Sequence, residues 1–147
     1  MKNFSKILLV VLAVFLLAGC GSKKANTVVT CSYTQNQSMF TMTQDVDIDI
    51  KDGTISNAKL VNEIVYADQY VGKYDETVLV DTMKEQFKTY KDVDVQPTST
   101  GVVVTINLDT DEFAKLSNMS VDDFKDIKED DIPELKSGLE SSGYTCK

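Results

Sequence analysis

A stretch of alternating side chains places the strongest constraint on the fold of this chain. Successive side chains of a β-strand point to opposite faces, so a period of two predicts a strand with one buried and one solvated face. From Met39 onward the sequence follows that period. Apolar Phe40, Met42, Val46, Ile48 and Ile50 fall on one face, and polar Thr41, Thr43, Asp45, Asp47 and Asp49 fall on the other. We therefore expect a sheet with one face in the core and one in water.

Two further strands are predicted beside this one. Thr27 to Tyr33 is rich in β-branched and apolar residues, which favour strands. Asp52-Gly53 supplies residues that tolerate positive φ, so we expect the chain to turn back there into a third strand, Thr54 to about Tyr66. The three strands together predict a meander.

The period changes after the meander, and a helix is expected from Asp75 to Lys91, with Asp75 placed to cap it. Its apolar residues recur at helical spacing: Leu79, Met83, Phe87 and Tyr90. Val93 to Val95 and Val102 to Leu108 then predict a second hairpin, because turn-forming Pro and Gly lie between them.

The C-terminal part is predicted to be helical. Thr110 to Leu116 is one short candidate, and Ser120-x-x-Asp123 resembles a capping box that opens another. Pro133 near the start of Ile132 to Ser142, with a Gly after its end, fits the usual preferences at helix termini. The fold class that follows is α+β, with an antiparallel sheet of about five strands covered on one face by helices.

The N-terminus predicts export. Lys2 and Lys6 precede an apolar run from Ile7 to Ala18, which is the order found in secretory signals. A helix of these twelve residues would reach about 18 Å at about 1.5 Å per residue, against a hydrocarbon core of about 30 Å. We therefore expect a removable signal peptide rather than a permanent transmembrane helix.

The end of this run resembles the lipobox of bacterial lipoproteins, Leu17-Ala18-Gly19-Cys20. Ordinary signal peptidase prefers a small residue at the third position before the cut, where this chain has Leu17. The resemblance implies cleavage before Cys20 and a diacylglyceryl group on its thiol, with acylation of the new amine as a further option. Two or more acyl chains make a lasting anchor, so we expect the membrane as a partner and the outer face of the cytoplasmic membrane as the location.

Three segments follow from these features: a signal peptide at 1–19, a lipidated cysteine with a short tether at 20–26, and a single α+β domain at 27–147. The tether would span at most about 20 Å. We therefore expect the domain to lie close to the lipid head groups, where Lys23 and Lys24 either contact anionic lipids or simply solvate the tether.

The remaining cysteines, Cys31 and Cys146, form an even pair once Cys20 is assigned to lipid. Export places them outside the reducing cytoplasm, where a crosslink persists. We predict a disulfide between them that fastens the first strand to the end of the last helix. The alternative is two free thiols, one of them catalytic, although the chain has no His to activate either.

Charge excludes one class of function. Two of the 15 lysines precede Cys20 and all 23 acidic residues follow it, so the formal charge after cleavage is −10. A chain this acidic, with no Arg, repels nucleic acid. Segment 107–134 alone holds ten acidic residues and three lysines. We interpret it as solvated helical faces and caps, with a docking surface for a basic partner or a weak cation site as the alternative.

Signs of catalysis or metal binding are few. The absence of His removes Ser-His-Asp and Cys-His pairs and the commonest zinc ligand. Ser56-x-x-Lys59 matches a spacing in penicillin-binding enzymes but lacks the partner motifs, so we attribute it to chance. Asp45, Asp47 and Asp49 begin like a calcium loop, which would need Gly where Ile50 stands. We predict no metal, no cofactor and no catalytic residues.

Three tyrosines recur at every fourth position where the third strand should lead into the main helix: Tyr66, Tyr70 and Tyr74. Tyrosine commonly packs with its ring half-buried and its hydroxyl in water. We favour that role over a ligand platform.

The lipobox at Cys20, the Thr30-Cys31-Ser32-Tyr33 segment and the closing Gly143-Tyr144-Thr145-Cys146-Lys147 together resemble the YehR-like family of small bacterial lipoproteins. The resemblance implies an α+β fold of unassigned activity, with no active-site residues to transfer. The function that we expect is a lipid-anchored extracytoplasmic module for binding or envelope structure, with an unknown protein or small-molecule partner. The alternative is an anchored hydrolase or other enzyme that uses carboxylates alone.

Overall fold

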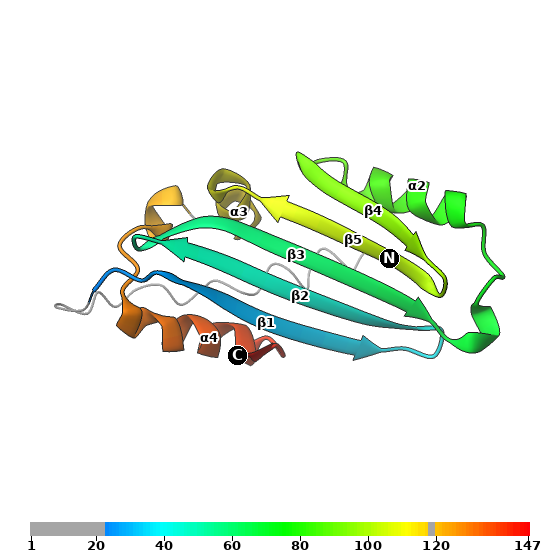
Figure 1. The fold of residues 1–147 in the computed structure, drawn as a ribbon, viewed down its shortest axis with the longest axis horizontal. Coiled ribbons are helices and arrows are strands. Elements are labelled where there is room, and N and C mark those ends of the chain that lie inside the picture. Colours follow the sequence, from blue (N-terminus) through cyan, green and yellow to red (C-terminus); the bar gives the residue numbers. More distant parts are fainter. Residues whose placement is uncertain (1–22, 118–119) are drawn as a thin grey trace.

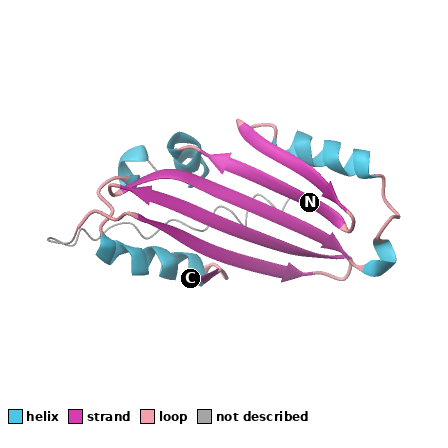
Figure 2. Cartoon of the chain, in the orientation of Figure 1, coloured by secondary structure: helices cyan, strands magenta, loops and turns pink. Residues whose placement is uncertain are grey.

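The computed structural model describes residues 23–117 and 120–147, and within them the chain has an α+β fold (Figure 1). The predicted signal peptide and Cys20 lie outside the described residues. In the described part, six strands form one antiparallel sheet and three α-helices pack with it (Figure 2). No helix in that part is long and apolar enough to cross a membrane.

The predicted meander is present. Strands β1 (Thr27–Asn36), β2 (Phe40–Lys51) and β3 (Thr54–Tyr66) pair in succession, with antiparallel registers. Asp52 and Gly53 make the β2–β3 turn with φ values of 49° and 74°. The turn was predictable because Asp and Gly tolerate this left-handed conformation better than other residues.

The second hairpin joins the meander at β3. Strands β4 (Asp92–Thr98) and β5 (Gly101–Leu108) pair with each other, and β5 also pairs with β3. The prediction of about five strands missed β6 (Thr145–Cys146), which pairs with β1 and gives the order β4-β5-β3-β2-β1-β6. Two residues are too few to show a period of two, so the sequence carries no signal for this strand.

The helices cover one face of the sheet, as predicted. Helix α2 (Glu76–Phe87) packs against β4, α3 (Thr110–Ser117) against β3 and β5, and α4 (Ile132–Ser141) against β1 and β6. The described residues also form three short 3₁₀ helices: η2 (Asp68–Tyr70) before α2, and η3 (Val121–Phe124) and η4 (Glu129–Asp131) between α3 and α4. Asp75 caps α2 by accepting hydrogen bonds from the backbone N–H groups of Thr77 and Val78.

Two helix predictions need correction. The main helix ends at Phe87 rather than Lys91, because β4 begins at Asp92 and the chain must turn before it. The predicted capping box at Ser120 and Asp123 is present, but it opens the 3₁₀ helix η3 rather than an α-helix.

The core lies between the sheet and the helices. Leu135 and Leu139 of α4 are buried in this core, together with alternate side chains of the strands. The strand residues include Val29, Val46, Ile48, Leu60, Val104 and Ile106. The apolar set that the period of two predicted for β2 therefore faces the core: Met42, Val46, Ile48 and Ile50 are at most 5% exposed.

Residues 23–26 are part of the domain, which corrects the predicted tether and the predicted domain start at Thr27. Ala25 is fully buried, and its N–H donates to the carbonyl of Ile127 at 2.9 Å. Its own carbonyl accepts from the N–H of Gly53 at 2.9 Å. A small apolar residue can lie between two backbone segments where a larger one would not fit, and a hydrophobic period does not reveal that role.

Candidate functional site

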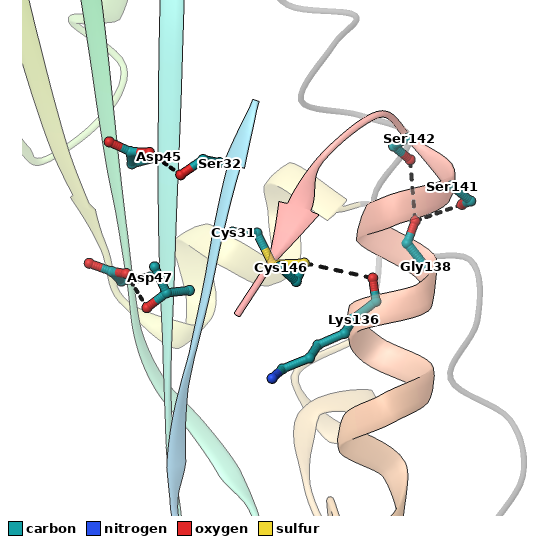
Figure 3. The surroundings of a disulfide bond; sticks show 10 residues. Cys31, Ser32, Asp45, Asp47, Lys136, Gly138, Ser141, Ser142 and Cys146 are labelled. Carbon is teal, nitrogen blue, oxygen red and sulfur yellow. Dashed lines mark hydrogen bonds between the residues drawn. A yellow bond between two sulfur atoms is a disulfide. The ribbon is translucent and has the colours of Figure 1, made fainter. Parts of the chain in front are cut away.

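The predicted pair Cys31 and Cys146 is joined in the structure. Cys31 of β1 and Cys146 of β6 lie directly opposite each other, with their Cα atoms 4.1 Å apart and a sulfur–sulfur bond (Figure 3). Cys31 is 1% exposed, so the bond lies at the edge of the core. The Cys146 sulfur is 3.8 Å from the carbonyl oxygen of Lys136. A disulfide sulfur has no proton to donate, so this is a packing contact rather than a hydrogen bond.

A buried polar chain adjoins the disulfide edge. Gln44 and Asn62 are register partners on the covered face, and the Gln44 side-chain amide donates to Asn62 Oδ1 at 2.6 Å. The Tyr144 hydroxyl donates to Gln44 Oε1. Burial, with a smaller effect from Tyr33, raises the pKa of Tyr144 to about 12. Sequence reasoning missed this chain, although Gln44 interrupts the apolar alternation of β2 and so gave a signal.

No helix in residues 23–117 and 120–147 packs on the opposite side of strands β1 to β5, and we call this side the open face. Its charged residues in the described part of the chain are Asp45, Asp47, Asp49, Lys51, Lys59, Glu63, Asp92 and Asp94. Six carboxylates against two lysines give it a negative charge.

Neighbouring strands hold the open-face carboxylates in place. Thr30 Oγ1 donates to Asp47 at 2.7 Å, and the Ser32 hydroxyl donates to Asp45 (Figure 3). On the same face, near the β4 edge of the sheet, Asn107 donates to Asp92 at 2.9 Å. Each of these bonds pairs one carboxylate with a neutral donor directly across the strands, so none of the three is an ion pair.

The calcium-like run forms part of this face. Asp45, Asp47 and Asp49 alternate along β2, and side chains two positions apart on a strand are about 6.6 Å apart. In residues 23–117 and 120–147, no three His, Cys, Asp or Glu side chains are grouped to hold a metal ion. Ser56 and Lys59 lie on β3 rather than at a helix start, and the Ser56 hydroxyl donates to the carbonyl of Asp49 at 3.1 Å.

The structure brings together two of the three predicted tyrosines. The rings of Tyr66 and Tyr74 have centroids 4.3 Å apart, and Phe40 contacts Tyr66 edge-on at 6.4 Å. Tyr70 lies in η2 between them in sequence. Desolvation raises the pKa of both Tyr66 and Tyr74. Phe40 and Tyr66 pack against the core at the end of the sheet farthest from Gly53. Met39, next to Phe40 in sequence, is 48% exposed, and its carbonyl accepts a hydrogen bond from the N–H of Ala67 at 3.0 Å.

The acidic segment supplies caps and ion pairs. Asp109 accepts from the N–H of Glu112 at 2.8 Å and pairs with Lys91 at 2.7 Å, while Asp122 pairs with Lys125 at 2.6 Å. These lysines lower the pKa of both carboxyl groups. The prediction of caps and solvated faces agrees with this arrangement.

Lys24 is also placed by this segment. Its ammonium group lies 3.5 Å from the Asp126 carboxylate, and the residue forms an isolated β-bridge with Lys128. The lysine that we expected to contact lipid or to solvate a tether therefore has a protein partner.

Comparison with known proteins identifies no family. No family model matches the sequence, and no curated protein matches it. An NMR structure of a protein from Streptococcus pneumoniae TIGR4 aligns with 90% of this chain and 92% of that chain, at 13% identity and a TM-score of 0.41. A likeness at that level carries no argument about function.

Proposed function

We propose that this protein is a lipid-anchored binding or envelope-structural module outside the cytoplasm, cleaved before Cys20 and held in the membrane by lipid on that residue. The observation that carries the proposal is the Cys31–Cys146 disulfide. It uses two of the three cysteines and leaves Cys20, in its lipobox-like setting, as the one available for lipid. A disulfide also fits an oxidising compartment.

The open face supports binding over catalysis. An enzyme that relies on carboxylates needs one with a raised pKa to donate a proton. Outside the open face, Lys91 and Lys125 lower the pKa of Asp109 and Asp122 instead, so neither of these two carboxyl groups is suited to donating a proton. A broad face on which six carboxylates outnumber two lysines suits recognition of a cationic surface.

Fatty-acid labelling tests whether Cys20 carries the lipid anchor. Cells that express the wild type, Cys20→Ser or Cys31→Ser/Cys146→Ser are grown with a clickable fatty acid, and the protein is isolated. We expect label on the wild type and on the double variant, because only Cys20 supplies the acylated thiol. Equal label on Cys20→Ser and the wild type would overturn the proposal.

Crosslinking in intact cells tests whether the module binds its partner through the open face. Asp45→Asn/Asp47→Asn on the open face is compared with Asp81→Asn/Glu85→Gln on α2, which removes the same charge from another surface. We expect the open-face variant alone to lose crosslinked partners. Identical crosslinks in both variants would assign recognition to a different surface.

A further inference from the structure

One end of the sheet holds the start of the described chain. Lys23, Lys24 and Ala25 lie between the β2–β3 turn and residues 127–129. Three backbone hydrogen bonds fix them: Ala25 N–H to Ile127, Gly53 N–H to Ala25 and Glu129 N–H to Lys23, each at 2.9 Å. A fourth, Ile127 N–H to Gly53, joins the two flanking segments at 2.9 Å. We call this the Gly53 end; it is the left-hand end of the sheet in Figure 1.

Three residue steps separate Lys23 from Cys20. Consecutive Cα atoms are 3.8 Å apart, so the two Cα atoms are at most about 11 Å apart. A lipid on Cys20 therefore holds the Gly53 end at the head-group layer. The opposite end of the sheet, with Phe40, Tyr66 and η2, is separated from it by the 13 residues of β3, or about 40 Å.

Charge favours an upright orientation. With a formal charge of −10 after cleavage, the domain is repelled by an anionic bilayer, and the repulsion acts over about one Debye length, roughly 8 Å at physiological salt. Laying the open face on the lipid would bring six carboxylates and two lysines into that layer. At the Gly53 end, residues 23–25, 52–53 and 126–129 carry three carboxylates, Asp52, Asp126 and Glu129, against three lysines, Lys23, Lys24 and Lys128. Lys24 and Lys128 lie within 4 Å of the carboxylate of Asp126.

We infer that the mature protein stands on its Gly53 end at the lipid head groups, with the open face accessible from the side and the Phe40–Tyr66–Tyr74 end farthest from the bilayer. The inference rests on the proposed lipid anchor. It identifies the membrane-contacting surface as the β2–β3 turn with residues 23–25 and 127–129, and it identifies the lipid head groups as the partner of that surface.

Site-specific quenching tests the orientation. All three native cysteines are occupied in the lipidated protein, so one introduced cysteine is a unique labelling site. Full-length lipidated protein carrying a fluorophore at Glu129→Cys, Gln69→Cys, Glu63→Cys or Lys84→Cys is inserted into vesicles that contain phosphatidylglycerol and a head-group spin label. These residues are exposed at the Gly53 end, the opposite end, the open face and α2 respectively.

We expect quenching at residue 129 to exceed quenching at the other three positions several-fold. A Gly-Ser insertion of about 20 residues between Ser22 and Lys23 gives a flexible tether, and it should weaken quenching at residue 129. Quenching at residue 63 or 84 equal to that at 129 would overturn the upright orientation while the anchor stands. Protein that carries no lipid by intact mass would overturn the anchor, and the orientation with it.

Discussion

At the scale of single residues, the Tyr144 hydroxyl links the last turn of the chain to the middle of the sheet. Its acceptor, Gln44, is 7% exposed and also donates to Asn62. A buried acceptor that loses its donor keeps its desolvation cost, typically about 1–3 kcal/mol. We therefore expect Tyr144→Phe to lower the free energy of unfolding by about 1–3 kcal/mol at pH 7, measured by urea denaturation.

The pH dependence of the free energy of unfolding should also reveal the contribution of Tyr144. The pKa of Tyr144 is raised from 10.0 to about 12, so folding favours the neutral phenol. This contribution is complete below pH 10 and is lost as the pH rises toward 12. Tyr144→Phe should flatten the decline over that interval but not abolish it, because the pKa of Tyr66, Tyr74 and Tyr90 is also raised. Parallel stability curves for wild type and variant would contradict the assignment.

The disulfide between Cys31 and Cys146 allows a second prediction about single residues. It closes a sequence separation of 115 residues, for which the chain-entropy model gives about 4–5 kcal/mol. Cys31→Ala/Cys146→Ala should therefore unfold at a markedly lower urea concentration. Thiol titration of wild type that is unfolded without prior reduction should find neither Cys31 nor Cys146. Two titratable thiols would show that the crosslink does not form in cells.

At the scale of elements, the strand pairing depends on Gly101. A Cβ built there would lie 1.8 Å from the backbone oxygen of Ile64, so β3 and β5 cannot keep their register around a side chain. Gly72 has open space around it, and its φ of 72° gives only conformational strain. We expect Gly101→Ala to cost more than about 3 kcal/mol, and Gly72→Ala about 1 kcal/mol. Similar thermal unfolding of the two variants would contradict this pairing.

The domain boundary can be tested in the same way. A soluble fragment that begins at Lys23 keeps Ala25 and its hydrogen bonds to Gly53 and Ile127, whereas one that begins at Thr27 loses them. We expect the longer fragment to be more stable in urea, with Ala25→Glu in the longer fragment as destabilising as the truncation. Equal stability of both fragments would show that residues 23–26 belong to the tether and not to the folded domain.

These elements differ in how far their sequence could predict them. β2 and β3 have long apolar alternation and a turn that requires Asp-Gly, so local chemistry alone defines them. β6 and the Lys23–Ala25 segment are defined by long-range contacts, to Cys31 and to Ile127, which no local period encodes. The cysteine pair could be predicted because the expected export and an even count, once Cys20 is assigned to lipid, constrain it. Gln44 and Asn62 could not, because their pairing requires the strand register.

At the scale of the whole molecule, the acidic charge is divided between the ion pairs and caps of segment 107–134 and the carboxylates of the open face. If the charge serves recognition rather than cation storage, millimolar calcium should leave the melting temperature of the fragment from Lys23 onward nearly unchanged. Sodium chloride at matched ionic strength is the control. A reproducible rise of several degrees with calcium alone would indicate a specific cation site, since a ligand that binds the native state stabilises it.

The central claim is that Cys20 becomes the lipidated first residue of the mature protein. The most direct measurement is the intact mass of the wild-type protein extracted with detergent from the membranes of the cells that make it. We predict a chain that lacks residues 1–19 and whose excess mass is that of a diacylglyceryl group, with or without a further acyl chain, localised to Cys20 by fragmentation. A chain that begins at Met1, or one cut elsewhere and free of lipid, would contradict the account.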